Sequence, residues 1–459
     1  MNISGVRRGL IVLVSAVSVL YSQENQQPNT LLTVPLHRAF GNAIRQHRSL
    51  QVPFTQLPNN AACLVDYGTT CYTPREISRA YGLEPLEEAG VNGEGQTIVI
   101  VVSFGSPTLA TDLKTFDAQF GLPDPPSLQI LAPLGTVPFD PTVIDQLIWA
   151  GETELDVEWA HALAPRANIV VLTSPVDETQ GLQGLPEFLQ LEQYALDHHL
   201  GQIISQSWGT AENSLFDAAG KELMNQFEAF YQQAAAEHVT VLAAAGDTGT
   251  QNVDANGTPY SLPTVLFPAS SPSVMAVGGT TLNLDANNDH QSETVWNDSS
   301  TQSGASGGGV SQYFVEPSYQ STLPPSTRAQ LSGGRGIPDV AFNADDNTPV
   351  WVYFGFFPDT TQNNFYAAGS GTSAATAQWA GIVADANQLA GGPLGLLNPT
   401  IYAIGAGGIQ TYFFHDITVG NNAYGGLPGY QATPGYDLAS GWGTPKLQAL
   451  LWELLNARY

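Results

Sequence analysis

The protein has 459 residues, 43% of them hydrophobic, with 41 acidic and 14 basic side chains. This hydrophobic content is enough for one large core or two modest ones, and it argues against a disordered chain, which would carry more charge. The formal net charge of −27 disfavours nucleic acid and anionic membranes as partners. Because carboxylates repel one another less once they are protonated, the composition favours an acidic habitat.

The N-terminal region is typical of an exported chain. Arg7 and Arg8 precede the apolar run 10–20, so we interpret residues 1–22 as a secretion signal, with an uncleaved membrane anchor as the alternative. Residues 23–71 form a partly basic segment, in which the only cysteines, Cys63 and Cys71, can pair after export or remain two free thiols. We therefore expect a secreted chain without membrane contact once the signal is removed.

From residue 72 onward, apolar runs rich in β-branched residues alternate with helical patterns. Strands are predicted over 97–102, 168–173, 202–207, 239–245 and 274–279, and helices over 109–120, 152–163, 185–198 and 215–237. Such alternation predicts an α/β fold in which helices cover both faces of a parallel sheet. We expect residues 72–459 to form one domain, with ligand sites at the carboxyl ends of the strands.

The segment GSGTSAATAQWAG, residues 369–381, places Ser373 near the start of an Ala-rich helix. A nucleophile there gains from the positive field of the helix N-terminus and from backbone N–H groups that can hold an oxyanion. The alternative is an ordinary helix cap.

A nucleophilic serine needs a base, and histidine is the obvious candidate. None of the eight histidines lies in the Gly-rich His-Gly-Thr-His context of a subtilisin. The first core strand, which ends in VVSFG, also lacks the aspartate motif that subtilisins carry there. A conventional subtilase with a Ser-His-Asp triad is therefore disfavoured.

A carboxyl base is available in GETELDVEWAHALAP, residues 151–165. On a helix, Glu152 and Asp156 share the apolar side, whereas Glu154, Glu158 and His161 are predicted to point to the polar side. Two carboxyls on a buried face cannot both ionise cheaply, so we expect them to share one proton, with one pKa raised. The alternative, an exposed acidic first turn, fits Glu154 better than Asp156.

A third acid follows an apolar strand in LAAAGDTG, residues 242–249. A protonated Asp247 at this strand end could donate a hydrogen bond to a developing oxyanion, which requires low pH. The alternative is that Asp247 only stabilises the turn.

These segments belong to an ordered series that resembles the sedolisins, serine-carboxyl peptidases with a subtilisin-like fold that work in acid. The series comprises GETELD, SWG (207–209), AAAGDTG, FPASSP (267–272), VGGT (277–280), GGGVSQYF (307–314), GRGIPDVAFNAD (334–345), GTSAATA and HDIT…GYD…GWGTP. The resemblance implies a three-layer fold with a mostly parallel central sheet. It also implies Ser373 as nucleophile, Glu152 as base and then acid, Asp156 as the group that tunes Glu152, and Asp247 as oxyanion stabiliser.

The implied use of glutamate agrees with elementary acid–base chemistry. Histidine, with a reference pKa of about 6.5, is protonated in acid and cannot serve as a base there. A glutamate, with a reference pKa of about 4.3, can still accept a proton.

The resemblance further implies one structural Ca²⁺ ion near the C-terminus. Asp416 and Asp437 would supply carboxylate oxygens, and Ile417, Thr433 and Gly435 would supply backbone carbonyls. Hard oxygen donors from flexible loops suit Ca²⁺. Thr433 stands where the family usually has glycine, which a carbonyl ligand tolerates. The alternative is that both aspartates are turn residues.

Trp208, Gly307, Gly308 and Gly309 are expected to line the substrate cleft, with an ordinary core tryptophan and turn glycines as the alternative. Sedolisins normally carry a much larger folded prosegment than residues 23–71, which we interpret as a vestigial one. The prediction is a monomeric, secreted, acid-acting endopeptidase that hydrolyses protein or peptide substrates through an acyl-enzyme. A tripeptidyl-peptidase with the same machinery and a catalytically silent binding protein are the alternatives.

Overall fold

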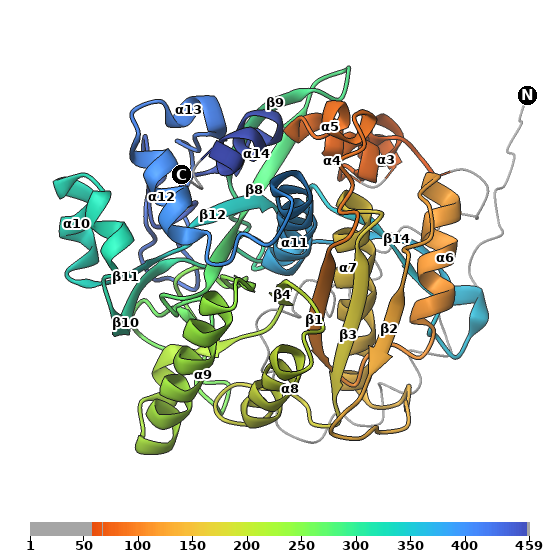
Figure 1. Ribbon diagram of the computed structural model, residues 1–459, viewed down its shortest axis with the longest axis horizontal. Helices are drawn as coiled ribbons and strands as arrows, with labels where there is room; N and C mark the ends of the chain where they lie inside the picture. The colour runs from red at the N-terminus through yellow and green to blue at the C-terminus, as the bar shows by residue number, and fades with distance from the viewer. Residues whose placement is uncertain (1–56, 67, 457–459) are drawn as a thin grey trace, which may run out of the picture.

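One large sheet is the framework of the molecule. The computed structural model describes residues 57–66 and 68–456, and eight of its strands form this sheet (Figure 1). Parallel neighbours follow the order β12-β8-β6-β4-β1-β3-β2, and β9 pairs antiparallel with β8. The bounds are β1 (Thr97–Ser103), β2 (Leu128–Leu131), β3 (Asn168–Ser174), β4 (Ile203–Gln206), β6 (Thr240–Ala244), β8 (Met275–Leu284), β9 (His290–Val295) and β12 (Val340–Asn343).

Helices cover this sheet on both faces (Figure 1). Helices α7 (Ile144–Leu163) and α11 (Gly371–Ala390) pack against each other and against β1. Helices α8 (Leu185–Asp197) and α9 (Ala218–Ala236) also pack against each other, α8 on β1 and β3 and α9 on β6. Helix α6 (Leu109–Phe120) lies on the outer side of α7. The predicted three-layer α/β fold is therefore confirmed.

The predicted elements match the observed ones closely wherever a strand is buried on both faces. All five residues of β6 are buried, as are six of the seven residues of β1, so their sequences are continuous apolar runs. Helix α6 has the bounds that the periodicity predicts. Helix α7 begins at Ile144, well before the predicted start at residue 152.

Short sheets and helices complete the fold. The two-stranded sheets are β5 (Thr210–Ala211) with β7 (Leu266–Phe267), β10 (Gly309–Val315) with β11 (Gly334–Ile337), β13 (Val350–Phe354) with β14 (Asn364–Gly369), and β15 (Phe414–His415) with β16 (Thr444–Pro445). The remaining helices are α3 (Asn60–Asp66), α4 (Pro74–Tyr81), α5 (Glu84–Glu88), η1 (Glu212–Leu215), η2 (Ser318–Thr322), α10 (Pro325–Leu331), η3 (Thr360–Gln362), α12 (Asn398–Ala406), α13 (Gln410–Phe413) and α14 (Leu447–Asn456).

The last part of the predicted N-terminal segment is attached to the domain. Cys63 and Cys71 form a disulfide bond, and Asn60 donates a 2.8 Å hydrogen bond to Glu76 of α4. The predicted secretion signal, residues 1–22, lies outside the described residues, so it stays a prediction, as does the domain boundary at residue 72. Within residues 57–66 and 68–456, no helix has the length and apolarity needed to cross a bilayer.

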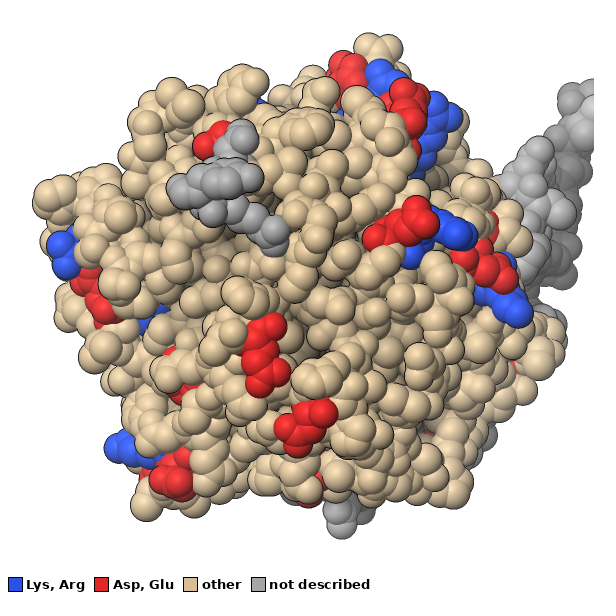
Figure 2. Space-filling view, in the orientation of Figure 1, with Lys and Arg blue, Asp and Glu red and all other residues tan. Residues whose placement is uncertain are grey.

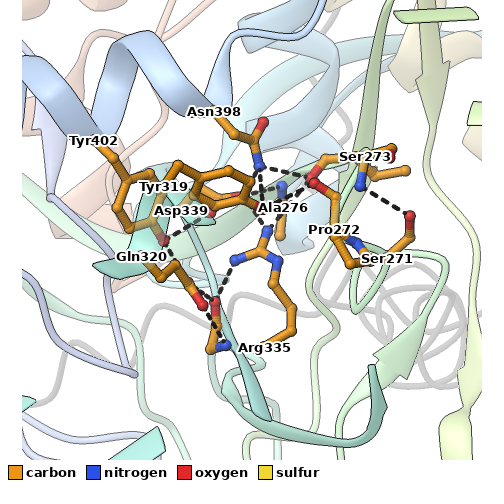
Figure 3. Close-up of polar contacts among 12 residues, drawn as sticks. Ser271, Pro272, Ser273, Ala276, Tyr319, Gln320, Arg335, Asp339, Asn398 and Tyr402 are labelled. Carbon is orange, nitrogen blue, oxygen red and sulfur yellow. Dashed lines mark hydrogen bonds and ion pairs between the residues drawn. The ribbon is translucent and has the colours of Figure 1, made fainter. Parts of the chain in front are cut away.

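A buried ion pair, Arg335 with Asp339, lies at the β12 edge of the sheet, and hydrogen bonds connect it to α12 (Figure 3). Arg335 and Asp339 are both fully buried, and the guanidinium Nη2 lies 2.6 Å from the Asp339 carboxylate. That carboxylate also accepts hydrogen bonds from Ala276 N, Asn398 Nδ2 and the Tyr402 hydroxyl. Because every bond converges on the residue just before β12, the network fixes the position of this strand.

Few charges appear on the face shown in Figure 2, where a mixed-charge cluster lies over α4 and α5. There Arg75 pairs with Glu84, and Arg79 pairs with Asp289. By contrast, many acids are buried in the interior. The fully buried carboxyl side chains include Glu154, Asp156, Glu158, Glu178, Glu192 and Asp385. Burial favours the protonated form of these carboxyls and raises the pKa of each of them well above its ordinary value.

Candidate active site

Ser373 lies at the start of α11, in the tight turn predicted from the sequence. It is the third residue of the helix, and its side chain is almost fully buried. The turn is formed by Gly371, which has a φ of +81° and donates a 2.7 Å hydrogen bond to Ala344 O. A Cβ atom at Gly371 would also lie 2.6 Å from Oδ2 of Asp247, so glycine is required here for two separate reasons.

Glu152 and Asp156 approach Ser373 from the neighbouring helix α7. Their side chains are 3% and 0% exposed, and α7 packs directly against α11. The Ser373 hydroxyl interacts with the Glu152 carboxyl and lowers its pKa, although Oγ of Ser373 has no hydrogen-bond partner among the described residues. Asp156, one turn further along α7, interacts electrostatically with Glu152 and accepts a 2.6 Å hydrogen bond from the Ser207 hydroxyl. The structure thus brings Ser373 together with Glu152 and Asp156, which lie more than two hundred positions earlier in the sequence.

Burial dominates the acid–base behaviour of this carboxyl pair. Loss of hydration raises the pKa of Glu152, and its interaction with the Ser373 hydroxyl offsets part of that rise. The pKa of Asp156 is raised well above its ordinary value, first by burial and then by the charge of Glu152, against a lowering by Ser207. Two interacting buried carboxyls titrate as a pair, and burial favours the protonated form of each.

Asp247 lies on the other side of Ser373, in the turn after β6. Its Oδ1 accepts a 2.8 Å hydrogen bond from Thr372 N and a 2.9 Å bond from the Thr372 hydroxyl. Its Oδ2 is buried and has no hydrogen-bond partner among the described residues. Burial is the main reason that the pKa of Asp247 is raised well above its ordinary value. A protonated Oδ2 therefore has a free O–H to donate toward an oxyanion.

The prediction that Glu154, Glu158 and His161 point to a polar surface was wrong. All three are fully buried. The reason is tertiary, because α6 and β13 cover the side of α7 opposite to α11. Glu154 accepts a 2.5 Å hydrogen bond from the Ser106 hydroxyl, and Glu158 accepts a 2.9 Å bond from Tyr353 N. The helix is buried on all sides and carries carboxyls on two of them.

Trp208 lies in the core. It is fully buried, and its ring packs against Phe188 at 4.7 Å and Phe227 at 6.1 Å between centroids. These contacts favour the core alternative, although the residue directly follows Ser207 and so lies close to Asp156. Its assignment as a cleft residue stays a prediction.

Gly307, Gly308 and Gly309 run beside the turn that holds Asp247. Gly307 N donates a 2.6 Å hydrogen bond to Gly246 O, the carbonyl just before Asp247. A Cβ atom at Gly307 or Gly308 would collide with backbone carbonyls, those of Ala245 and Leu438 respectively. Close backbone packing accounts for these two glycines, and their contact with substrate stays a prediction.

The five predicted calcium ligands come from two segments that meet. Gly435 N donates to both carboxylate oxygens of Asp416, at 3.1 and 3.2 Å, and Thr433 N donates to Asp437 Oδ2 at 2.9 Å. Ile417 is 2% exposed beside Asp416. Both aspartates therefore lie against the loop that carries the predicted carbonyl ligands, but the printed contacts between them are hydrogen bonds from backbone N–H groups, so the calcium site stays a prediction.

Two residues of the site were not predicted from the sequence. Ser207 donates to Asp156, and Thr372 holds Asp247. Both lie within motifs that the sequence analysis names, SWG and GTSAATA. The signal was therefore present, but a serine or threonine next to a candidate residue does not reveal a partner far away in sequence.

The arrangement is suited to acyl transfer, because a hydroxyl nucleophile, a carboxyl proton carrier and an oxyanion donor lie together in one buried site.

A model of the subtilase family matches residues 148–402, more than half of the chain. Kumamolisin from Bacillus sp. (strain MN-32) is 38% identical over 391 residues, covering 83% of this chain and 64% of its own. The structure of Pseudomonas sedolisin, a serine-carboxyl proteinase complexed with two molecules of pseudo-iodotyrostatin, has a TM-score of 0.71 at 26% identity. That match covers 85% of this chain and 100% of the other. The chain belongs to the sedolisin family.

The sequence is also similar to that of a tripeptidyl-peptidase. Tripeptidyl-peptidase 1 of Rattus norvegicus is 33% identical over 323 residues, covering 66% of this chain and 52% of its own. The chain thus spans less than two thirds of the length of the curated relatives named here.

Proposed function

We propose that this sedolisin is a secreted, acid-acting serine-carboxyl endopeptidase. The observation that carries the proposal is the placement of Ser373, at the start of α11, against the buried Glu152 and Asp156 of the adjoining helix α7. A serine at a helix N-terminus is common, but a buried serine that interacts with a buried glutamate next to a second buried carboxyl is the arrangement that nucleophilic catalysis needs.

The proposed chemistry moves one proton through Glu152. The Ser373 hydroxyl attacks the carbonyl carbon of the scissile bond and gives its proton to the Glu152 carboxylate. Glu152 then donates that proton to the amide nitrogen, the C–N bond breaks, and the amine leaves. A water molecule next gives a proton to Glu152 and attacks the acyl-enzyme. The proton returns to Ser373 as the carboxylic acid product departs.

Asp156 and Asp247 support these steps in different ways. Asp156 holds the shared proton, so that Glu152 can carry the negative charge, and the Ser207 hydroxyl fixes its orientation. Protonated Asp247 donates from Oδ2 to the oxyanion of each tetrahedral intermediate, where a donor contributes most because charge develops there.

Acid activity follows from the protons that this mechanism requires. Asp156 and Asp247 must both be protonated, and burial raises the pKa of each. As the pH rises, Asp247 ionises and the oxyanion loses its donor. Burial raises the pKa of Glu152 too, so its protonation sets the limit of activity as the pH falls, because a protonated Glu152 can no longer act as a base.

A Ca²⁺ ion bound by Asp416, Asp437 and the carbonyls of Ile417, Thr433 and Gly435 is part of the proposal. The ion would neutralise two nearby carboxylates and tie the segment after β15 to the loop before β16. The role is structural.

Endopeptidase and tripeptidyl-peptidase activities are both consistent with this machinery. We propose the first, and similarity to tripeptidyl-peptidase 1 keeps the second as the alternative. The substrates are proteins or peptides, and we expect a monomer.

The test is hydrolysis of a long, unstructured peptide from about pH 3 to about pH 8, which spans carboxyl and histidine titration. Products are identified by mass, with Ser373→Ala as the control. Internal cleavage in acid supports the proposal, and release of tripeptides alone supports the alternative. A folded protein that cleaves nothing, or a Ser373→Ala variant that cleaves as well as the parent, would contradict it.

A further inference from the structure

The loop after β3, residues 175–184, lies beside the segment 207–211, and the mechanism above assigns it no role. Gln180 of this loop is 3% exposed, and its side-chain amide bonds two backbone groups of the segment. Nε2 donates to Gly209 O at 3.3 Å, and Oε1 accepts a 2.9 Å hydrogen bond from Ala211 N. The amide thus pairs with the segment as a neighbouring strand would, with one donor and one acceptor.

Other contacts hold the same segment on both of its sides. Next to Gln180, Gly181 N donates to the Thr210 hydroxyl at 2.7 Å. On the opposite side the segment pairs with β7, so closely that a Cβ atom at Gly209 would lie 2.9 Å from Phe267 O. The segment is therefore packed between the loop and β7, and the Gln180 amide sets its distance from the loop.

The loop is in turn fastened to α7 and to β1. Trp149 of α7 donates from Nε1 to Asp177 Oδ1 at 2.7 Å. Glu178 N donates to the hydroxyl of Ser103, the last residue of β1, at 3.1 Å. Because α7 also carries the carboxyl pair of the active site, the loop connects this helix to the segment 207–211.

We propose that Gln180 is a positioning residue, which sets the Ser207 hydroxyl against Asp156 by holding the segment 207–211 to the loop after β3. Ser207 lies two residues before the carbonyl that Gln180 binds, and it donates a 2.6 Å hydrogen bond to Asp156. Without the amide, two backbone groups of the segment lose their partner, the segment moves, and the bond from Ser207 to Asp156 is weakened. This inference rests on the proposed function, because it concerns the protons of the carboxyl pair.

The bond from Ser207 acts on the charge that the carboxyl pair carries. Burial and then the charge of Glu152 raise the pKa of Asp156, whereas Ser207 lowers it. The other acid that faces the pair is Asp247, in the turn after β6, whose pKa is raised by burial and also by the charge of Glu152. Because a lost donor disfavours the ionised pair, the pair becomes fully protonated at a higher pH. The pH below which kcat/KM falls should then move upward.

Two substitutions of Gln180 test this role through kcat/KM between about pH 3 and about pH 8, the range of carboxyl and histidine titration. Gln180→Leu should lose up to about 10²-fold, the usual cost of a misplaced group, and its activity should begin to fall in acid at a higher pH than that of the parent. Gln180→Glu should stay close to the parent in acid, because a protonated carboxyl keeps one donor and one acceptor. Equal losses in the two variants, or an unmoved acid limit in Gln180→Leu, would overturn the proposal.

Gln320 supplies a matched control, because its amide makes the same pair of backbone bonds at the β12 edge of the sheet (Figure 3). Nε2 donates to Gly336 O at 2.7 Å, and Oε1 accepts a 3.0 Å bond from Gly336 N. Gln320→Leu should lower the melting temperature and leave the acid limit of kcat/KM where it is in the parent. A shift equal to that of Gln180→Leu would mean that lost stability alone moves the limit, and the positioning role would be wrong.

Hydrogen exchange separates a failure of this inference from a failure of the proposed function. If the parent cleaves no peptide, the proposed function is wrong, and exchange of the Ala211 N–H still reports on the Gln180 amide. This exchange should be faster in Gln180→Leu than in the parent, and close to the parent in Gln180→Glu in acid. Unchanged exchange in Gln180→Leu would overturn the proposal. If Gln180→Leu does not fold, Gln180→Asn, whose amide is one carbon shorter, replaces it in each measurement with the same expected results.

Discussion

Oδ1 of Asp247 accepts two hydrogen bonds from Thr372, one from its backbone N–H and one from its hydroxyl. Thr372 directly precedes Ser373, so the oxyanion acid is fastened to the peptide that carries the nucleophile. Its second oxygen, Oδ2, is buried without a hydrogen-bond partner among the described residues, and in the proposed mechanism it is the atom that donates to the oxyanion. One carboxylate oxygen of Asp247 thus holds the side chain in place, while the other remains without a hydrogen-bond partner among the described residues.

Replacing Asp247 tests whether a neutral donor is what the site needs. Asp247→Ala should lower kcat by about 10²–10³, the usual effect of removing an oxyanion donor. Asp247→Asn keeps both an acceptor for Thr372 and a donor that does not ionise, so its activity should fall less steeply with rising pH than that of the parent. The measurement is kcat/KM across pH for all three proteins. Near-parent activity of Asp247→Ala would refute the assignment.

The two reasons for glycine at position 371 can be separated with Gly391, the glycine that caps the C-terminal end of the same helix. Gly371 and Gly391 both have positive φ, +81° and +67°, but only a Cβ at Gly371 meets a neighbour. Gly371→Ala and Gly391→Ala should each lose about 1–2 kcal/mol of unfolding free energy from backbone strain. Only Gly371→Ala should also lose most of its activity, because its new methyl group displaces Asp247. Equal activity of the two variants would show that the Asp247 contact is unimportant.

Calcium removal should lower stability without altering the chemistry. Because an ion that binds only the folded state stabilises it by about 2.7 kcal/mol at a hundred times its Kd, a chelator should lower the melting temperature by several degrees. Added Ca²⁺ should restore it. Asp437→Asn should respond to neither treatment, whereas Asp254→Asn should respond like the parent. A parent that is insensitive to chelator would contradict the proposed site.

The buried acids on the outer side of α7 predict higher stability in acid. Burial, and then the charge of Asp112, raise the pKa of Glu154 well above its ordinary value. A raised folded pKa means that the stabilisation is present below the unfolded pKa and is lost as the pH rises, at up to about 1.4 kcal/mol per pH unit. The melting temperature of Glu154→Gln relative to the parent should therefore increase between acid and neutral pH. A decrease over that range would mean that Glu154 is ionised in the folded protein.

The sequence predicts those strands and helices in which buried apolar residues recur at a regular spacing or form an unbroken run. Strands β1, β3, β6 and β8 are recognisable because both of their faces are buried. Strand β2 was missed because its four residues are only partly buried or exposed, so its apolar run is weak. The motifs were also sufficient to nominate Ser373, which the structure brings together with residues of α7 and of the turn after β6.

What the sequence could not reveal depends on contacts between distant segments. Helical periodicity assigned Glu154 to a polar side because it contains no information about the hairpin of β13 and β14 that covers α7. Likewise Ser207 looks like an ordinary strand-end residue in sequence, and only the fold brings its hydroxyl to Asp156. Partners of this kind require the tertiary structure.

The most direct test of the account is kcat/KM of Glu152→Gln in acid, together with its melting temperature. Glutamine has nearly the same shape but cannot accept the Ser373 proton, so activity should fall by about 10²–10⁴ while the melting temperature stays close to that of the parent. A folded Glu152→Gln protein that cleaves peptides as fast as the parent would contradict the central claim that Glu152 carries the proton of Ser373.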